Sequence, residues 1–163
     1  MFEVLVFVYE NYWRGEACPE LAHLEVKLNA AGFEADEIEE ALNWLDELHL
    51  AAARSPPLVA LTPTSQTLPV APKPRSMRIY TLDEQDHLGV QCLGFITFLE
   101  ALGALSADTR EIVIDRAMAA PADPLPLEDL KIIVLMVFWS LGQEPDALVL
   151  DELCDNAFCR VAH

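Results

Sequence analysis

The chain has 163 residues, of which 53% are hydrophobic, and it carries 27 acidic against 10 basic side chains, for a formal net charge of −17. The length favours one domain or two small subdomains, and the hydrophobic content excludes a chain that stays disordered for lack of apolar residues. The acidic excess disfavours general binding to nucleic-acid backbones or to anionic membranes, because both require clustered Lys and Arg.

Residues 1–54 predict three short helices. Apolar residues at helical spacing predict a first helix from Phe2 that ends at Gly15, although alternating valines leave a strand as the alternative. A second helix is expected from Pro19 to Ala31, where Gly32 follows as the typical residue after a helix end. A third is expected over 35–48. Three short helices with tight turns resemble a helix-turn-helix unit.

The third predicted helix bears on function. It contains Asp36, Glu37, Glu39, Glu40, Asp46 and Glu47 and no Lys or Arg. Such a helix would be repelled by DNA phosphates. A DNA-binding helix-turn-helix regulator is therefore kept only as the alternative function.

A proline-rich segment divides the chain. Six of the eleven prolines lie within residues 55–75, which contain no acidic residue and are expected to form an extended, mobile linker over 56–72. Leu58–Leu61 leaves a short strand or wing as an alternative. We therefore expect a three-helix block at 1–54, the linker at 55–75, and a helical bundle at 76–163.

The second half predicts about four helices. Thr81 and Glu84 have the spacing of a capping box, which opens a long helix that ends near Gly103. Ser106 is expected to cap the next helix, which stops by Pro121. The fold class is therefore all-α, with a last helix from Asp146 to about Phe158.

The segment 127–141 is expected to be the most buried helix. It is apolar on all sides from Ile132 to Trp139, but fifteen residues are too few to span a bilayer, which needs about 20. On this basis Lys131→Glu is expected to be tolerated far better than Leu135→Asp.

The N-terminus and the cysteines predict a cytoplasmic protein. Glu3 and the lack of basic residues at the start make a poor secretion signal. The four cysteines are scattered, which favours reduced thiols; they are Cys18, Cys92, Cys154 and Cys159.

Catalytic and metal-binding motifs are not apparent. The sequence has no GxSxG, no Walker A loop and no GxGxxG, and none of its four histidines forms an HxxxH or HExxH pair. Cys154, Cys159 and His163 are the best metal candidates, but on one helix the two sulfurs would lie about 140° apart. Buried thiols are preferred, and no metal, cofactor or catalytic residue is assigned.

Three residues are candidates for contact with a partner. Arg75 and Arg78 belong, with Lys73, to the one local excess of positive charge. They would contact phosphate or an acidic partner or, as the favoured interpretation, the chain's own acidic helices, notably at Asp36-Glu37 and Glu39-Glu40. Trp44 is expected to pack internally and would be a partner anchor if exposed.

Arg78 is further expected to be fixed just before the Thr81 cap. Ile79 and Tyr80 are predicted to be buried beside it, which leaves the Arg78 guanidinium able to pair bidentately with a carboxylate of another helix.

Several motifs are spread along the chain in order: Met1-Phe2-Glu3-Val4-Leu5, Gly32-Phe33, Ala41-Leu42-Asn43-Trp44-Leu45, Ser76-Met77-Arg78-Ile79-Tyr80-Thr81, Gly94-Phe95, Phe98-Leu99-Glu100, Thr109-Arg110-Glu111, Val113-Ile114-Asp115-Arg116, Leu127-Glu128-Asp129-Leu130-Lys131 and Leu135-Met136-Val137. Together these motifs resemble the Smg family of bacterial proteins. The resemblance implies a small cytoplasmic protein without an assigned biochemical role. Its genes often lie near those for a DNA-processing protein of natural transformation and for topoisomerase I.

Composition and motifs together favour a non-enzymatic adaptor or regulator that binds a protein. An acidic surface suits a basic partner, such as a protein that handles nucleic acid. Direct binding to nucleic acid or to a membrane is not expected.

Overall fold

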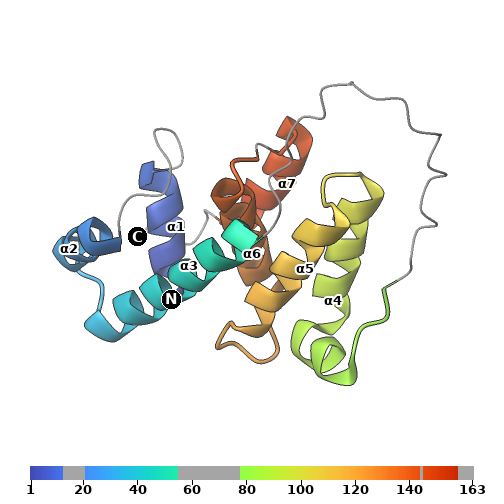
Figure 1. The fold of residues 1–163 in the computed structure, drawn as a ribbon, viewed down its shortest axis with the longest axis horizontal. Helices are drawn as coiled ribbons and strands as arrows, with labels where there is room; N and C mark the ends of the chain where they lie inside the picture. Colours follow the sequence, from blue (N-terminus) through green and yellow to red (C-terminus); the bar gives the residue numbers. More distant parts are fainter. Residues whose placement is uncertain (13–20, 55–77, 144, 158–163) are drawn as a thin grey trace.

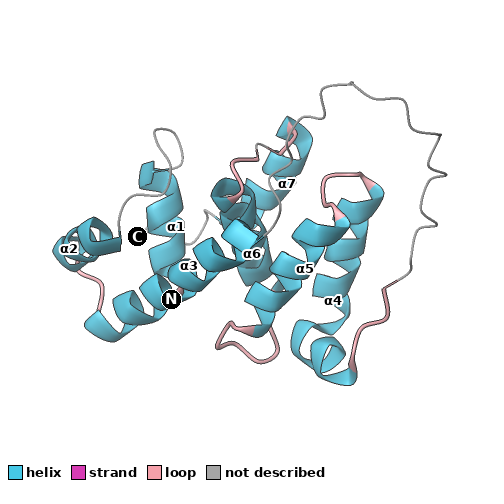
Figure 2. Cartoon of the chain, in the orientation of Figure 1, coloured by secondary structure: helices cyan, strands magenta, loops and turns pink. Residues whose placement is uncertain are grey.

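The described part of the chain folds into α-helices and contains no strand (Figures 1 and 2). This computed structural model describes residues 1–12, 21–54, 78–143 and 145–157. The helices are α1 (Phe2–Tyr12), α2 (Leu21–Ala31), α3 (Ala35–Arg54), α4 (Leu82–Ala101), α5 (Ala107–Met118), α6 (Leu127–Ser140) and α7 (Ala147–Ala157). The all-α prediction is therefore confirmed, and the linker expected at 56–72 lies outside the described residues.

Helix α1 forms despite its valines, because burial on one face decides between helix and strand. Val4, Leu5 and Val8 are fully buried, as helical spacing requires. The predicted end of this helix at Gly15 lies outside the described residues.

The turn from α2 to α3 is tight. Gly32 has φ of 97°, a conformation that favours glycine, and donates its N–H to the Asn29 carbonyl at 3.2 Å. Phe33 donates to the Leu28 carbonyl at 3.3 Å, which completes a Schellman motif. The Phe33 ring then contacts Phe7 edge to face, with centroids 5.5 Å apart, so this turn fastens α2 and α3 to α1.

Helix α3 continues to Arg54, six residues beyond the predicted end at Leu48. The extension contains three consecutive alanines, the best helix formers, and no helix-breaking residue. The sequence placed the helix end at the last buried apolar position, Leu48. The helix continues past it because a helix does not need buried side chains to continue.

Helix α4 begins with the predicted capping box. The Glu84 N–H donates to the Thr81 hydroxyl at 3.3 Å, and the Thr81 N–H donates to a Glu84 carboxylate oxygen at 2.8 Å. The helix is broken at Gly89, whose φ of 63° and ψ of 174° are not helical. The sequence predicted one long helix, because the apolar spacing continues through Gly89. The structure has two helical pieces instead, because glycine readily adopts a positive φ.

Helix α6 is the most buried element, as predicted. Every residue from Asp129 to Phe138 is buried, and Leu135 is only 3% exposed. Lys131 is also buried, and its ammonium donates to the Glu152 backbone carbonyl at 2.7 Å and to the Glu152 carboxylate at 3.1 Å. This burial under α7 removes the reason to expect that Lys131→Glu is tolerated far better than Leu135→Asp.

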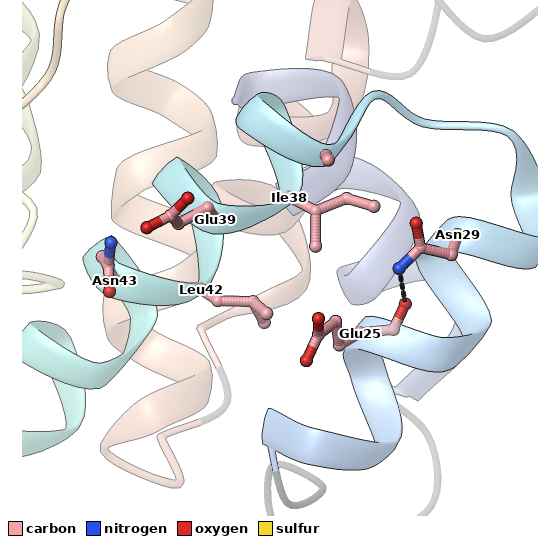
Figure 3. Close-up of a pocket in the computed structure, with 7 residues that line it drawn as sticks. Glu25, Asn29, Ile38, Glu39, Leu42 and Asn43 are labelled. Atoms are coloured by element: carbon pink, nitrogen blue, oxygen red, sulfur yellow. Dashed lines mark hydrogen bonds between the residues drawn. The ribbon is translucent and has the colours of Figure 1, made fainter.

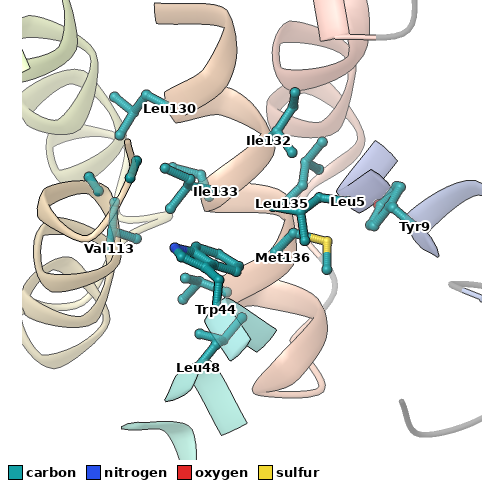
Figure 4. Packing of buried hydrophobic residues seen from close by; sticks show 14 of the residues in the cluster. Leu5, Tyr9, Trp44, Leu48, Val113, Leu130, Ile132, Ile133, Leu135 and Met136 are labelled. Carbon is teal, nitrogen blue, oxygen red and sulfur yellow. The ribbon is translucent and has the colours of Figure 1, made fainter. Parts of the chain in front are cut away.

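Helices from both sides of the proline-rich segment contribute to one core. Helices α1 and α3 pack against α6, and α3 also packs against α5. Figure 4 shows Trp44 and Leu48 of α3 beside Ile133 and Met136 of α6. The expected division into blocks remains a prediction, but the described helices of the two segments share this core.

The segment before α4 differs from the prediction at one position. Ile79 is 88% exposed rather than buried. In an extended chain, alternate side chains share a side, and the Arg78 guanidinium lies over the Tyr80 ring at 4.8 Å, which turns Ile79 away.

No described helix is long and apolar enough to cross a membrane.

Candidate functional site

A groove lies between α2 and α3. It has a volume of about 270 Å³ and receives side chains from both helices, as Figure 3 shows. Its lining residues are Glu25, Asn29, Ala35, Ile38, Glu39, Leu42 and Asn43. The tight turn at Gly32 places the two helices side by side and so forms the groove walls.

Polar and apolar groups are separated within this α2–α3 groove. Ile38 is buried, and Leu42 is half-buried and packs against the core, so the two form an apolar floor. Glu25 and Glu39 bring one exposed carboxylate from each helix. Such an arrangement suits a long cationic side chain, whose methylene stem needs an apolar surface and whose head needs an anion.

Neither groove carboxylate makes an ion pair with any residue the structure describes, whereas many other acids do. The Asn29 amide nitrogen donates to the backbone carbonyl of Glu25 at 2.9 Å and leaves the Glu25 carboxylate oxygens free of that bond. Both carboxylates are therefore open to a cation from outside the described chain.

The groove residues were not identified from the sequence. They do have a readable spacing, since a glutamate is followed four residues later by an asparagine on both helices, as Glu25 to Asn29 and Glu39 to Asn43. This spacing places each pair on one helix face. It could not show that the two faces meet.

Arg78 is held by two carboxylates. Its terminal nitrogens donate to the two Glu84 oxygens at 3.0 and 2.9 Å, and its Nε donates to the two Glu111 oxygens at 2.8 and 2.9 Å. The predicted bidentate pairing is confirmed. The partner carboxylates lie on α4 and α5, so Arg78 does contact acidic helices of its own chain, but not the one at 36–40 that the sequence analysis singled out.

The ion pairs continue along α4 and α5. Arg110 donates to Glu111 at 2.8 Å and to Glu100 at 2.6 Å, so Glu111 bridges two guanidinium groups. Hydrogen bonds from Arg78 lower the pKa of Glu84 to about 2. Burial would raise the pKa of Glu111, but hydrogen bonds from Arg78 and Arg110 outweigh this effect and lower it. These groups stay charged at neutral pH and fasten α4 to α5.

The other predicted partner contacts are placed as follows. Trp44 is 4% exposed, and its indole N–H donates to the Arg116 carbonyl at 3.1 Å. The condition of exposure, on which a partner role depended, is not met at this residue. Arg75 lies outside the described residues, and Arg78 is occupied as described above.

Of the four cysteines, the structure describes the side chain of Cys92. Cys92 is buried, its thiol donates to the Leu125 carbonyl at 3.3 Å, and burial raises its pKa to about 11, so it behaves as the expected inert thiol. Within the described ranges no three His, Cys, Asp or Glu side chains are grouped as metal ligands. Cys159 and His163 lie outside those ranges, and the Cys154 side chain is not described.

Comparison with known proteins identifies full-length relatives. Residues 1–163 match the family described as "Protein of unknown function (DUF494)". The chain is 53% identical to "Protein Smg homolog" of Leptothrix cholodnii and 52% identical to that of Methylibium petroleiphilum, with all of each chain covered. It is 45% identical to the Bordetella pertussis homologue, also over all of both chains. No solved structure matches.

Proposed function

The chain belongs to the DUF494 family, in which the relatives above are named Protein Smg homolog, and on that premise we propose that it is a non-enzymatic adaptor that binds a basic protein partner. The observation that carries the proposal is the α2–α3 groove, with its apolar floor and two carboxylates that no described cation occupies. A Lys or Arg side chain of the partner would lie on Ile38 and Leu42 and end between Glu25 and Glu39.

The charge of the whole chain supports the same kind of partner. A net charge of −17 attracts basic proteins over several ångströms and raises their rate of association. The exposed face of α3 strengthens the field beside the groove. Its exposed acids are Asp36, Glu39, Glu40, Asp46 and Glu47.

A nucleic-acid-handling protein is the partner class that we favour. Such proteins carry clustered Lys and Arg for contact with phosphates, and an acidic groove could bind the same side chains. The gene neighbourhood that the Smg resemblance implies is consistent with this class. A regulator of this kind would act by occupying a basic surface and needs no chemistry of its own.

Direct DNA binding is the alternative function. Helices α2 and α3 with their tight turn are the feature that favours it. The exposed acids of α3 oppose it, because a recognition helix must lie against phosphates. The adaptor function is therefore the stronger proposal.

The groove is tested with a fluorescent lysine- and arginine-rich peptide and with a glutamine-substituted peptide as its neutral control. We expect the basic peptide alone to bind, and the double variant Glu25→Gln/Glu39→Gln to bind about tenfold more weakly, the loss of about 1.4 kcal/mol typical of one charge-assisted contact. The matched variant Glu10→Gln/Asp86→Asn removes the same charge from exposed positions on α1 and α4. Equal weakening in both double variants would show that only net charge matters.

The partner itself is sought by affinity capture from a native lysate at low and at moderate salt, followed by mass spectrometry. Support requires a basic protein whose capture falls with salt and is lost with the groove variant but kept with the matched variant. Anisotropy titration with duplex DNA runs in parallel. Sub-micromolar DNA binding with strong salt dependence would replace the adaptor by the alternative function.

A further inference from the structure

The α2–α3 groove has the size of one long side chain. Its volume of about 270 Å³ lies below the roughly 300 Å³ at which sites for small organic ligands begin. Its floor is the buried Ile38 and the half-buried Leu42, so the occupant must place an apolar stem there. On the proposed function this occupant is a cationic side chain of the partner, which is either Lys or Arg.

The polar groups of the groove accept hydrogen bonds, and they come from both helices. Glu25 brings a carboxylate from α2, and Glu39 brings one from α3. An ionised carboxylate accepts hydrogen bonds and donates none. A cation that enters the groove therefore meets acceptors on two separate walls.

Asn29 adds a third acceptor, because its donor is already used. Its amide nitrogen donates to the backbone carbonyl of Glu25, one turn earlier on α2, at 2.9 Å. Figure 3 shows the amide nitrogen directed at that carbonyl and the amide oxygen turned away from it. This oxygen accepts no hydrogen bond from the residues that the structure describes, so it is the group that Asn29 offers to an occupant of the groove.

We propose that the groove selects an arginine side chain of the basic partner over a lysine, and that Asn29 determines this selection. The inference rests on the proposed function, because it assumes that the groove holds a cation. A guanidinium carries five N–H donors spread over a plane, whereas an ammonium carries three on a single, strongly hydrated atom. The guanidinium can donate to both carboxylates and still direct an N–H at the Asn29 oxygen, and its weak hydration suits the apolar floor.

The amide at position 29 gives selectivity without adding attraction. A carboxylate there would lie one turn from Glu25 on the same helix face, and like charges at this spacing destabilise a helix. The amide oxygen carries no net charge, so it adds little to the pull on a cation of either kind. Loss of this oxygen should therefore remove the difference between Arg and Lys and leave the general affinity for cations in place.

The test uses three fluorescent peptides of equal charge in anisotropy titrations with the full chain. One carries Arg at every basic position, one carries Lys, and one carries asymmetric dimethylarginine, which keeps the charge but loses N–H donors. We expect the Arg peptide to bind about tenfold more tightly than the other two, the difference that one additional charge-assisted hydrogen bond makes. Asn29→Ala should weaken the Arg peptide to the affinity of the Lys peptide and leave the Lys peptide unchanged.

The matched control is Asn11→Ala on α1. The Asn11 amide nitrogen makes the same kind of bond, to the Phe7 carbonyl at 2.7 Å, and Asn11 is exposed but does not line the groove. This variant should leave the affinities of all three peptides unchanged. Both variants exchange an exposed asparagine for the better helix former alanine, so thermal melting should show that both stay folded.

Equal affinity of the Arg and Lys peptides for the parent chain would overturn the selection and leave the adaptor function in place. An Arg preference that persists in Asn29→Ala, or that Asn11→Ala also removes, would overturn the role of Asn29. Equal weakening of both peptides by Asn29→Ala would overturn it as well, because it would indicate a structural effect on the groove. Binding of neither peptide would refute the proposed function itself, and this inference with it.

Discussion

Removal of the Arg78 guanidinium should destabilise the fold more than removal of any exposed arginine. The Arg78 side chain is 19% exposed and Glu84 only 15%, so their bidentate pair is largely shielded from water. Hydrogen bonds to charged groups contribute about 1.5–3 kcal/mol. Glu111 is half exposed and still pairs with Arg110 when Arg78 is removed. Loss of the Arg78–Glu111 pair should therefore add less than about 1 kcal/mol to the destabilisation.

We therefore expect Arg78→Ala to lower the free energy of unfolding by about 2–3 kcal/mol. For a chain of this size each kcal/mol corresponds to about 2–4 °C, so the melting temperature should fall by about 4–12 °C. Differential scanning calorimetry at pH 7 measures it. The melting temperature of Arg78→Lys should lie between those of the parent chain and Arg78→Ala, because an ammonium keeps the charge but cannot form the planar pair.

The control is Arg54→Ala at the end of α3, where the arginine is exposed and makes no ion pair with described residues. It should change the free energy of unfolding by less than about 1 kcal/mol. Arg75→Ala is expected from the sequence to be similarly mild. Equal melting temperatures for the Arg78 and Arg54 variants would refute the reasoning, because they would show that the Arg78 ion pairs add nothing to stability.

Four further outcomes are expected. The Glu84–Arg78 pair should stabilise the fold fully above pH 4.5 and progressively less as the pH falls toward about 2, because folding lowers the pKa of Glu84. In Arg78→Ala, NMR titration of the carboxyl groups should show a higher pKa for Glu84. Trp44→Phe should cost about 1–3 kcal/mol in urea unfolding, because it leaves a buried α5 carbonyl without its donor. Lys131→Glu and Leu135→Asp should both destabilise the chain strongly in the same assay, because each places a negative charge at a buried position. Purified protein should show no measurable binding to duplex DNA near physiological salt, and an anisotropy titration that detects sub-micromolar binding would contradict this expectation.

Local features were predictable because their determinants are close in sequence. The capping box at Thr81 depends on residues three positions apart, and the burial of α6 follows from its unbroken apolar run. The break at Gly89 was not predictable in the same way, because the apolar spacing continues through it. Periodicity reports which side is buried and not whether the backbone stays helical.

Features that join distant segments could not be derived from the sequence. Glu111 as a partner of Arg78 lies 33 residues away, and the carbonyl that receives the Trp44 N–H lies 72 residues away. The α2–α3 groove is an intermediate case. The spacing of Glu25 and Glu39 places each on a defined helix face, but only the packing of α2 on α3 shows that these two faces meet.

The core shared by α1, α3, α5 and α6 determines how the proline-rich segment can vary. Because helices on both sides of it cover α6, folding brings the two ends of this segment to one core. The entropy of closing a loop grows slowly, by about 0.6 kcal/mol for each doubling of length. Insertions and deletions between residues 55 and 75 should therefore change the free energy of unfolding only slightly. A chain cleaved there would have to reassemble from two fragments, because each carries part of the apolar core around α6.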